Sequence, residues 1–416
     1  MKQIMGFSLL LGLGVIGFAG CSKGLHSGES DKANHEAPVK EISISPMVQA
    51  SVNDFSFNFL QHLEASAPKD ENFFVSPLSL HMDLGMVLGG ASGTTYDEML
   101  KVLDLDGKSL DQVNKAYKTL LAGLPNADPK VQLGLYNSIW YKKVFPFKQD
   151  YLKSMQDNFE ATVKALDFKP DDASYINDWA DEKTNGKIKK VLDAIQPDDV
   201  MFLVNALYFK GDWSAKFDKS KTRAADFHLE DGSTKQVQMM HQSSSFKHYS
   251  AADYTAIQLP YGNGQFSMTV ILPKQGQTLN KVLSGLGSTD WANIQDNMVA
   301  GKINLGLPRF TIPAYEIKLN SVLEAMGMKA AFSSKTADFS NMSSQSIYVS
   351  FVKQDTYLKV DEQGTEAAAV TTTGMVTTSV QIPQEVLCDH PFGIIISEKT
   401  SNTILFMGKI MNPDSE

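Results

Sequence analysis

The residue types that usually carry out chemistry are present in this chain, but they are not spaced for catalysis. Its 416 residues contain no G-x-S-x-G and no H-E-x-x-H sequence, and the eight histidines fall in no metal-ligand spacing. A formal G-x-G-x-x-G at Gly12–Gly17 follows no strand and opens no βαβ unit, which a dinucleotide site requires. We therefore expect no catalytic residues, no cofactor and no metal, and a tethered hydrolase is the least favoured function.

The two cysteines predict chemistry of a different kind. Phe18–Cys21 resembles a bacterial lipobox, and it follows an apolar run, Phe7–Phe18, that is too short to cross a bilayer of about 30 Å. We expect a cleaved signal peptide over residues 1–20 and lipid modification of Cys21; a plain secretory signal with a chance cysteine is the alternative. No internal disulfide framework is then possible, and Cys388 is expected to be a small buried apolar residue.

The most unusual stretch is the small-residue, threonine-rich segment Gly364–Gln381. It has almost no large apolar side chain for a core, yet it is rich in β-branched residues, which favour extended backbone. No proline occurs before Pro383, so every backbone N–H can join a sheet. Such a segment is normally an aggregation hazard, so its presence indicates that forming a strand is its purpose. Taken alone, a low-complexity Ala/Thr linker explains it equally well. Its β-branched residues are Val370, Thr371, Thr372, Thr373, Val376, Thr377, Thr378 and Val380.

Alternation along an extended strand divides this segment into two faces. The first face is small and weakly polar, so it can slip beneath a sheet without burying a charge, whereas Glu366 falls on the face that can stay in solvent. The first face holds Thr365, Ala367, Ala369, Thr371, Thr373 and Met375, and the second holds Glu366, Ala368, Val370, Thr372, Gly374 and Val376.

The elements that must position this segment are mostly helices in the first half of the chain and strands in the second. Ser76 and Pro77 form a good helix start, with a capping hydroxyl before a proline at the first helical position. Without regular βαβ alternation, this order predicts an α+β fold with large, mostly antiparallel sheets. We expect helices over Asn53–Leu63 and Ser174–Asn185, and a third that begins at Ser76 and has Leu80, Leu84, Val87 and Leu88 on one face. We expect strands over Met201–Phe209, Phe266–Leu272, Ile303–Leu307, Gly393–Ser397 and Thr403–Met407.

Charge and composition bound the organisation of the chain. The net charge of −9 and the scattered basic residues argue against nucleic-acid binding. Ser22–Ser45 is polar and has no apolar periodicity, which predicts a flexible tether over residues 21–47. No comparable break follows Val48, so residues 48–416 are expected to form one domain.

From Val48 to Pro413 the chain resembles the serpin family, through motifs that are weak singly and specific in their order and spacing. They are Asn72–Ser79, Ile176–Ile188, Leu203–Trp213, Gln238–Gln242, Leu259–Tyr261, Ile271–Pro273, Asp389–Phe392 and Leu405–Lys409. The resemblance implies a large main sheet with further sheets, about nine helices, and an exposed reactive-centre loop at about 362–385.

The resemblance implies that this loop is bait for a protease. The protease nucleophile attacks the scissile carbonyl to form an acyl-enzyme, and the cleaved loop inserts into the main sheet as an extra strand. The thirteen residue steps from Thr365 to Thr378 span about 43 Å, at about 3.3 Å each. The attached protease is carried over this distance, which distorts its oxyanion hole before deacylation is complete. The native fold is then expected to be kinetically trapped. The hinge of inhibitory members is matched by Glu362, Gly364, Thr365, Glu366, Ala367, Ala368 and Ala369.

The reactive bond has several candidate positions. Family spacing from Gly364 gives Thr378–Ser379, spacing back from Pro391 gives Val380–Gln381, and Met375–Val376 and Val376–Thr377 are further candidates. None of these residues is Lys or Arg, so a trypsin-like pocket with an acidic floor has nothing to pair with. Elastase-like, subtilisin-like or papain-like endopeptidases are the expected partners.

The resemblance also assigns polar residues around the hinge. Gln354 stands where the family has a histidine and can donate and accept a hydrogen bond but cannot titrate. Trp213 matches a tryptophan at the breach, the top of the main sheet, and Glu362 with Arg309 matches an ion pair worth under about 1 kcal/mol if it is exposed. The shutter, a polar cluster beneath the opening strands, is matched by Ser76, Ser79 and Asn205.

Two further expectations concern role and location. The alternative function is a non-inhibitory serpin that binds or carries another molecule; the small hinge residues argue against it, because such relatives have bulky or charged residues there. The protein is expected to be an exported monomer, held by its lipid in the cell envelope at the outer membrane, the cell surface or the periplasmic side.

Overall fold

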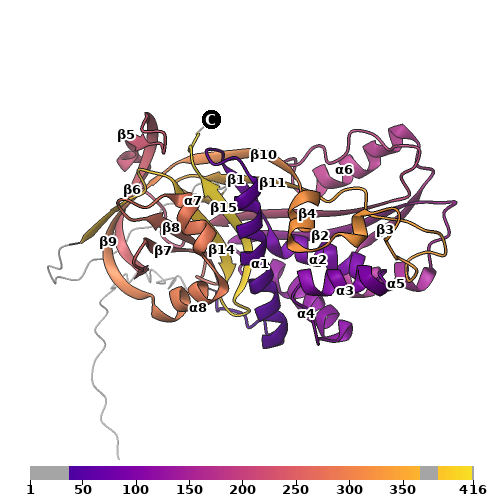
Figure 1. Cartoon of the computed structure of the whole chain (residues 1–416). Helices are drawn as coiled ribbons and strands as arrows, with labels where there is room; N and C mark the ends of the chain where they lie inside the picture. The colour runs from indigo at the N-terminus through magenta and orange to yellow at the C-terminus, as the bar shows by residue number, and fades with distance from the viewer. Residues whose placement is uncertain (1–36, 366–382, 415–416) are drawn as a thin grey trace, which may run out of the picture. The chain divides into compact units, whose positions relative to one another are not determined.

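The computed structural model describes residues 37–365 and 383–414, which lie within one compact unit, Glu36–Glu416. The described residues form nine α-helices and two β-sheets (Figure 1). The helices are α1 (Pro46–Ser66), α2 (Pro77–Leu88), α3 (Gly93–Val102), α4 (Leu110–Gly123), α5 (Gln149–Phe159), α6 (Ala173–Lys183), α7 (Leu279–Gly285), α8 (Ser288–Asn297) and α9 (Asn320–Met326).

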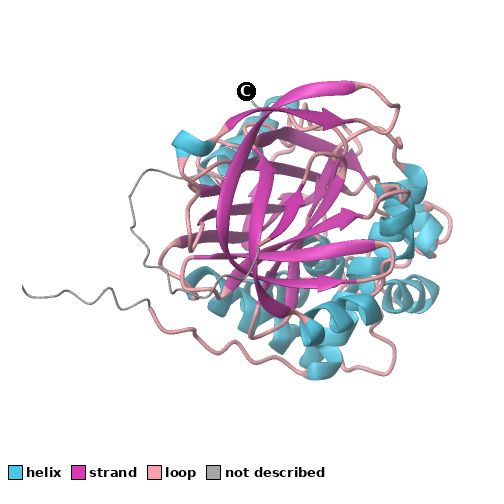
Figure 2. Ribbon diagram, turned by 90° about the vertical axis from the view of Figure 1, so that its left-hand side faces the viewer, coloured by secondary structure: helices cyan, strands magenta, loops and turns pink. Residues whose placement is uncertain are grey.

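The larger sheet has nine strands, in the order β1-β15-β14-β8-β7-β6-β9-β13, with β5 paired to β6. All its pairs are antiparallel except β13 with β9. Figure 2 shows these strands twisting strongly across the molecule, with helices gathered along its edges. The strands are β1 (Phe73–Val75), β5 (Arg223–His228), β6 (Thr234–Ser250), β7 (Tyr254–Tyr261), β8 (Phe266–Pro273), β9 (Val299–Pro308), β13 (Gln384–Leu387), β14 (Phe392–Glu398) and β15 (Thr403–Ile410).

The second sheet has six strands, in the order β10-β11-β12-β4-β2-β3, and is the one that positions the hinge. Its pairs are antiparallel except β2 with β3. The strands are β2 (Val131–Lys142), β3 (Thr162–Leu166), β4 (Met201–Asp212), β10 (Phe310–Lys318), β11 (Lys353–Val360) and β12 (Gly364–Thr365).

Helices cover both faces of the six-stranded sheet. On one face, α6 packs Ile176 and Trp179 against Trp140 of β2 and Phe202 of β4, with the Trp140 and Trp179 rings edge to face at 6.3 Å. On the other face, α2 contacts both β4 and β15. The middle of β4 is therefore enclosed from both sides.

The expected fold class is confirmed, and the expected helices and strands are all present. α2 begins at Pro77, and the Ser76 hydroxyl accepts a hydrogen bond from the Ser79 amide at 3.2 Å, which is the cap that the sequence predicts. Cys388 is fully buried, and burial, with the nearby Asp389 charge, raises the pKa of its thiol.

The end of the segment assigned to the tether packs against the domain, which differs from its expected flexibility. The Ile42 side chain is 3% exposed and lies over Gly123. The Lys40 amide donates to Gln265 Oε1, and Gln265 Nε2 donates to Lys40 O. A single apolar residue and backbone hydrogen bonds give no periodic signal, so the sequence did not reveal this contact.

In the part of the chain that the structure describes, no helix is long and apolar enough to cross a membrane.

Candidate functional site

The hinge begins inside the six-stranded sheet. Gly364 and Thr365 form β12, a two-residue strand that pairs with β11 through Val360 and with β4 through Gly211 and Asp212. Within the described residues, 37–365 and 383–414, no hydrogen-bonded ladder joins β4 directly to β11. The two long strands are therefore linked through β12. β12 is therefore the point at which a longer strand could continue between them.

Gly364 is the residue that lets the chain enter the sheet so tightly. Its φ is +154°, and a Cβ atom there would lie 2.8 Å from Asp212 Cα and would overlap Gly211 O. A side chain at this position would therefore push the hinge off β4.

Thr365 points into the core beneath the sheet. It is 1% exposed, and its hydroxyl lies 2.7 Å from the Tyr261 hydroxyl. Burial raises the pKa of Tyr261, which stays a neutral phenol. Tyr261 stacks on Trp213 at 4.5 Å between ring centroids, and Trp213 Nε1 donates to Asp361 O at 2.9 Å. Trp213 therefore holds the turn from which β12 departs.

The Glu362 carboxylate is buried, so its ion pair is not the exposed one for which a small contribution was expected. Its side chain is 1% exposed, whereas that of its partner Arg309 is 35% exposed. The Thr222 hydroxyl also donates to Glu362 at 2.7 Å. Burial pushes the pKa of Glu362 up, but the hydrogen bonds from Thr222 and Arg309 outweigh it, and the net pKa is lowered.

Gln354 fastens the start of β11 to the start of α2. Its Oε1 accepts from the Ser76 amide at 2.8 Å, and its Nε2 donates to Ser76 O at 2.9 Å. The Ser76 hydroxyl donates to Leu405 O in β15 at 2.6 Å. An amide satisfies both backbone groups of Ser76 at once, whereas a neutral imidazole could do so in only one tautomer.

Asn205 lies at the centre of the shutter cluster, and it has a partner that the sequence did not reveal. Its Oδ1 accepts from the Ser79 hydroxyl, and its Nδ2 donates to Asn137 Oδ1 at 2.7 Å. Asn137 faces Asn205 in the register of β2 and β4 and donates to Phe159 O at 2.8 Å. The available signal was an adjacent pair of polar residues, Asn137 and Ser138, within the largely apolar run Leu133–Trp140.

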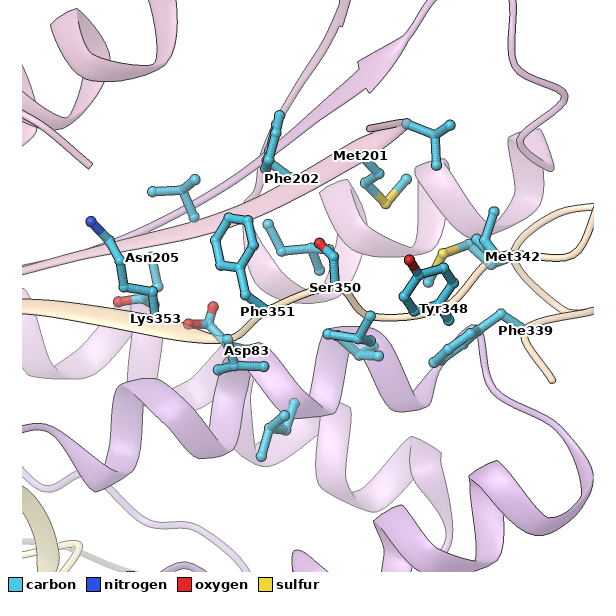
Figure 3. A pocket seen from close by; sticks show the side chains of 18 of the residues that line it. Asp83, Met201, Phe202, Asn205, Phe339, Met342, Tyr348, Ser350, Phe351 and Lys353 are labelled. Atoms are coloured by element: carbon cyan, nitrogen blue, oxygen red, sulfur yellow. The ribbon is translucent and has the colours of Figure 1, made fainter. Parts of the chain in front are cut away.

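A cavity opens beneath this cluster, between β4, α2 and the segment that leads into β11. Figure 3 shows its lining, with Phe202 and Met201 from β4 on one side and Tyr348, Phe351 and Lys353 on the other. Asp83 rises into it from α2. The structure thus brings Asn205 to the same gap that β12 enters at its other end.

The remaining site predictions lie outside the described residues. These are the rest of the hinge (Glu366, Ala367, Ala368 and Ala369), the candidate reactive-bond residues (Met375, Val376, Thr378, Ser379, Val380 and Gln381) and the lipidation residue Cys21. The described chain resumes at Pro383 and enters β13, parallel to β9.

No group of three or more His, Cys, Asp or Glu side chains within 37–365 and 383–414 is arranged to hold a metal ion.

Comparison with known proteins places these features in a family. A family model described as serpin (serine protease inhibitor) matches residues 50–413. An uncharacterised serpin-like protein of Thermococcus kodakarensis is 35% identical over 387 residues, covering 90% of this chain and 88% of the relative.

Two solved structures are also similar. The thermophilic serpin tengpin in its native state has a TM-score of 0.81 at 30% identity, over 91% of this chain and 97% of tengpin. Human thyroxine-binding globulin in complex with thyroxine has a TM-score of 0.80 at 27% identity, over 88% of this chain and 99% of the globulin. With the family motifs, the hinge entering the sheet and the fold all in agreement, this chain belongs to the serpin family.

Proposed function

We propose that this serpin is a suicide-substrate inhibitor of serine, and also of papain-like cysteine, endopeptidases. The observation that carries the proposal is β12, which enters between β4 and β11 where no direct ladder joins them among the described residues. An acyl-enzyme formed on the loop would be drawn along this gap as the loop extends β12. The chain then acts as an inhibitor and not as an enzyme.

The dimensions of the gap suit this role. The twelve residues of β4 offer an edge of about 40 Å at about 3.3 Å per residue, which is close to the span of Thr365–Thr378. Insertion would satisfy the backbone groups on the facing edges of β4 and β11. Distortion of the trapped protease's oxyanion hole then removes the donors that deacylation needs.

The targets that we propose are elastase-like, subtilisin-like or papain-like endopeptidases. The proposal rests on the loop sequence, in which no Lys or Arg lies near the candidate bonds. Mass spectrometry of the fragments released by one protease of each class would identify the cut bond among Met375–Gln381.

Substitution of Thr365 tests the mechanism. Thr365→Arg would place a charge where the side chain is 1% exposed, so we expect the loop to be cut without an SDS-stable complex. Glu366→Arg is the matched control: alternation places this residue on the solvent face, so complexes with an elastase-type protease should persist. Rapid cleavage of the unsubstituted chain with no covalent complex would show that the proposed function is wrong.

A carrier function is the second candidate, and one observation favours it. A structural neighbour, thyroxine-binding globulin, was solved with a hormone bound, so the fold accommodates a small ligand. The small residues Thr365 and Ala367–Ala369 favour inhibition over this alternative.

We also propose that Cys21 carries a lipid that anchors the protein in the cell envelope, on the strength of the lipobox-like Phe18–Cys21. Metabolic labelling with an alkyne fatty acid should mark the unsubstituted chain and not Cys21→Ser.

A further inference from the structure

The cavity beneath the shutter combines apolar walls with several polar side chains and is large enough for a small organic molecule. Its space for water-sized groups is about 130 Å³, comparable with the roughly 150 Å³ in which an engineered apolar cavity holds benzene. Residues from four separate segments of the chain enclose it (Figure 3). Its apolar walls include Met201, Phe202, Phe339, Met342, Ile347 and Phe351.

One carboxyl group in this cavity has no partner. Asp83 Oδ1 is buried and makes no hydrogen bond within the described chain, and no ion pair to Asp83 is formed there. Burial raises the pKa of Asp83 well above its usual range. Buried polar atoms in native proteins are normally satisfied, so the unpaired Oδ1 of this partly exposed side chain, which lines the cavity, indicates that its partner is supplied from outside.

The one cationic side chain among the described residues that line the cavity is already engaged. Lys353 Nζ is 3.1 Å from Asp355 Oδ1 and 3.2 Å from Glu316 Oε2, so one ammonium serves two carboxylates. Burial, opposed by Lys353, raises the pKa of Asp355 to about 6. Lys353 is thus committed to two carboxylates, whereas Asp83, which also lines the cavity, has no cationic partner among the described residues, so the cavity favours an additional positive charge at Asp83.

The other elements around the cavity do not supply that charge. β4 contributes the uncharged Asn205, and His81 on α2 is held by Tyr117 and Leu103 in the core. In the segment before β4, Lys190 pairs with Asp193 at 2.6 Å, in the exposed part of the surface. Further charged groups on these neighbouring elements include Lys318 on β10, Lys210 and Asp212 at the end of β4, Lys359 near the end of β11, and Lys187, Lys189, Asp198 and Asp199 before β4.

We propose that this cavity binds a small amphipathic cation, a primary ammonium attached to an aromatic or branched alkyl group. The ammonium would donate to the Asp83 carboxylate, and the apolar group would lie between the side chains of β4 and those of the 347–353 segment. A site of this kind, with apolar walls and one oriented polar group, is the usual form of a small-molecule pocket.

Occupancy would also affect the gap that the loop uses, a consequence that rests on the proposed inhibitory function. The ligand would lie between β4 and β11, beyond β12, so it must leave before the loop can insert to its full length. The loaded protein should therefore trap proteases more slowly than the empty protein, while the loop is cut at the same bond.

Proton linkage gives the site a signature that a purely apolar pocket lacks. The raised pKa of Asp83 favours its protonated form in the empty protein, and pairing with an ammonium would favour the ionised form and release a proton. Binding should therefore strengthen as the pH rises from 6 to 8, because a primary amine with a pKa of about 10 stays charged over this range.

The test is isothermal titration of the uncleaved chain with 2-phenylethylammonium at pH 6 and pH 8. We expect tighter binding at pH 8, with proton release seen as a difference in heat between two buffers, and no binding of 3-phenylpropionate. Asp83→Asn should weaken binding about tenfold or more at pH 8. Glu316→Gln is the matched control, because it removes a carboxylate that pairs with Lys353, is 54% exposed and lies outside the lining, and it should bind as the unsubstituted chain does.

Three outcomes would overturn the proposal: no heat of binding at millimolar amine, equal binding of the neutral 2-phenylethanol, or full affinity in Asp83→Asn. Circular dichroism of each variant separates loss of the site from loss of the fold. Because no protease enters this experiment, its failure is distinguishable from failure of the inhibitory function, which is read from SDS-stable complexes.

Discussion

At the scale of single residues, the buried pair Glu64 and Lys409 ties α1 to β15. Both side chains are fully buried, with Lys409 Nζ 3.1 Å from Glu64 Oε2. Lys409 also donates to Asn280 Oδ1 at 3.1 Å and to Pro68 O at 3.2 Å. Such a pair is weak evidence of net stabilisation, but removing one member leaves an uncompensated charge.

Lys409→Met is therefore expected to lower the free energy of unfolding by about 3 to 5 kcal/mol. Lys69→Met is the matched control, because Lys69 contacts the same Glu64 at 3.3 Å with its side chain 57% exposed, and should cost under about 1 kcal/mol. Urea denaturation of both variants gives the comparison. Equal effects would mean that burial does not decide the strength of these ion pairs.

His390 makes a pH-dependent contribution to stability. Its Nδ1 lies 2.8 Å from Asp389 Oδ1 and its Nε2 lies 2.9 Å from Pro273 O, so both ring nitrogens face acceptors and the imidazolium satisfies both. The hydrogen bond to Asp389, opposed by burial, raises the pKa of His390. The same hydrogen bond lowers the pKa of Asp389, which stays ionised near neutrality.

The pKa of His390 is higher in the folded protein than in the unfolded chain, where it is about 6.5. The stabilisation from His390 is therefore fully present below about pH 6.5 and is lost as the pH rises through the pKa of the folded protein. His390→Gln should therefore destabilise more at pH 5.5 than at pH 9, by under about 1 kcal/mol for this partly exposed pair. Urea midpoints at the two pH values measure the difference. A larger loss at pH 9 would contradict the assignment.

At the scale of elements, β12 decides whether the sheet is closed at its top. Two residues contribute few hydrogen bonds, so the strand depends on the close approach that Gly364 permits. The Trp213 indole reports on this contact, because its N–H donates to Asp361 O in the adjoining turn.

Gly364→Ala should dislodge β12, because its methyl group would overlap Gly211 O. We expect faster hydrogen exchange at residues 210–213 and a red shift of Trp213 fluorescence as the indole meets water. Gly276→Ala is the control: its φ is +83° with no atom within 4 Å of an added Cβ, so it carries backbone strain without a clash. Unchanged exchange in Gly364→Ala would show that the hinge tolerates a side chain.

At the scale of the whole molecule, β4 and β11 are joined through β12 and by no direct ladder among the described residues, and in the proposed mechanism a further strand would extend this pairing. A strand inserted between them would add backbone hydrogen bonds along most of the twelve residues of β4. In the proposed mechanism, the uncut loop prevents this, and the native state is stable kinetically.

Cleavage of the loop by an elastase-type protease is therefore expected to raise the melting temperature by more than about 10 °C, since several kcal/mol of new pairing are gained. Thr365→Arg should be cut at the same bond with a much smaller rise, because its hinge cannot follow into the sheet. Differential scanning fluorimetry before and after cleavage measures both. A cut unsubstituted chain with an unchanged melting temperature would exclude insertion.

Residues close together in the sequence are enough to predict the fold class and the family of this protein. The Ser76 cap, the apolar runs of the strands and the ordered motifs predict the α+β fold and the family, because they depend on residues close together in the chain. The alternation from Thr365 onward likewise predicts a strand-forming hinge, and Thr365 faces the core.

Only the tertiary structure shows which side chains from distant segments contact one another. Asn137 meets Asn205 across 68 positions, Ile42 packs on Gly123, and the buried Glu362 pairs with Thr222 and Arg309. Nothing in the sequence indicated a role for Asp83, because it is one polar residue among apolar ones on α2. Its unpaired oxygen becomes apparent only in the structure, where Asp83 lines the cavity between β4 and β11. Burial and pairing depend on which distant segments meet, and no local pattern encodes that.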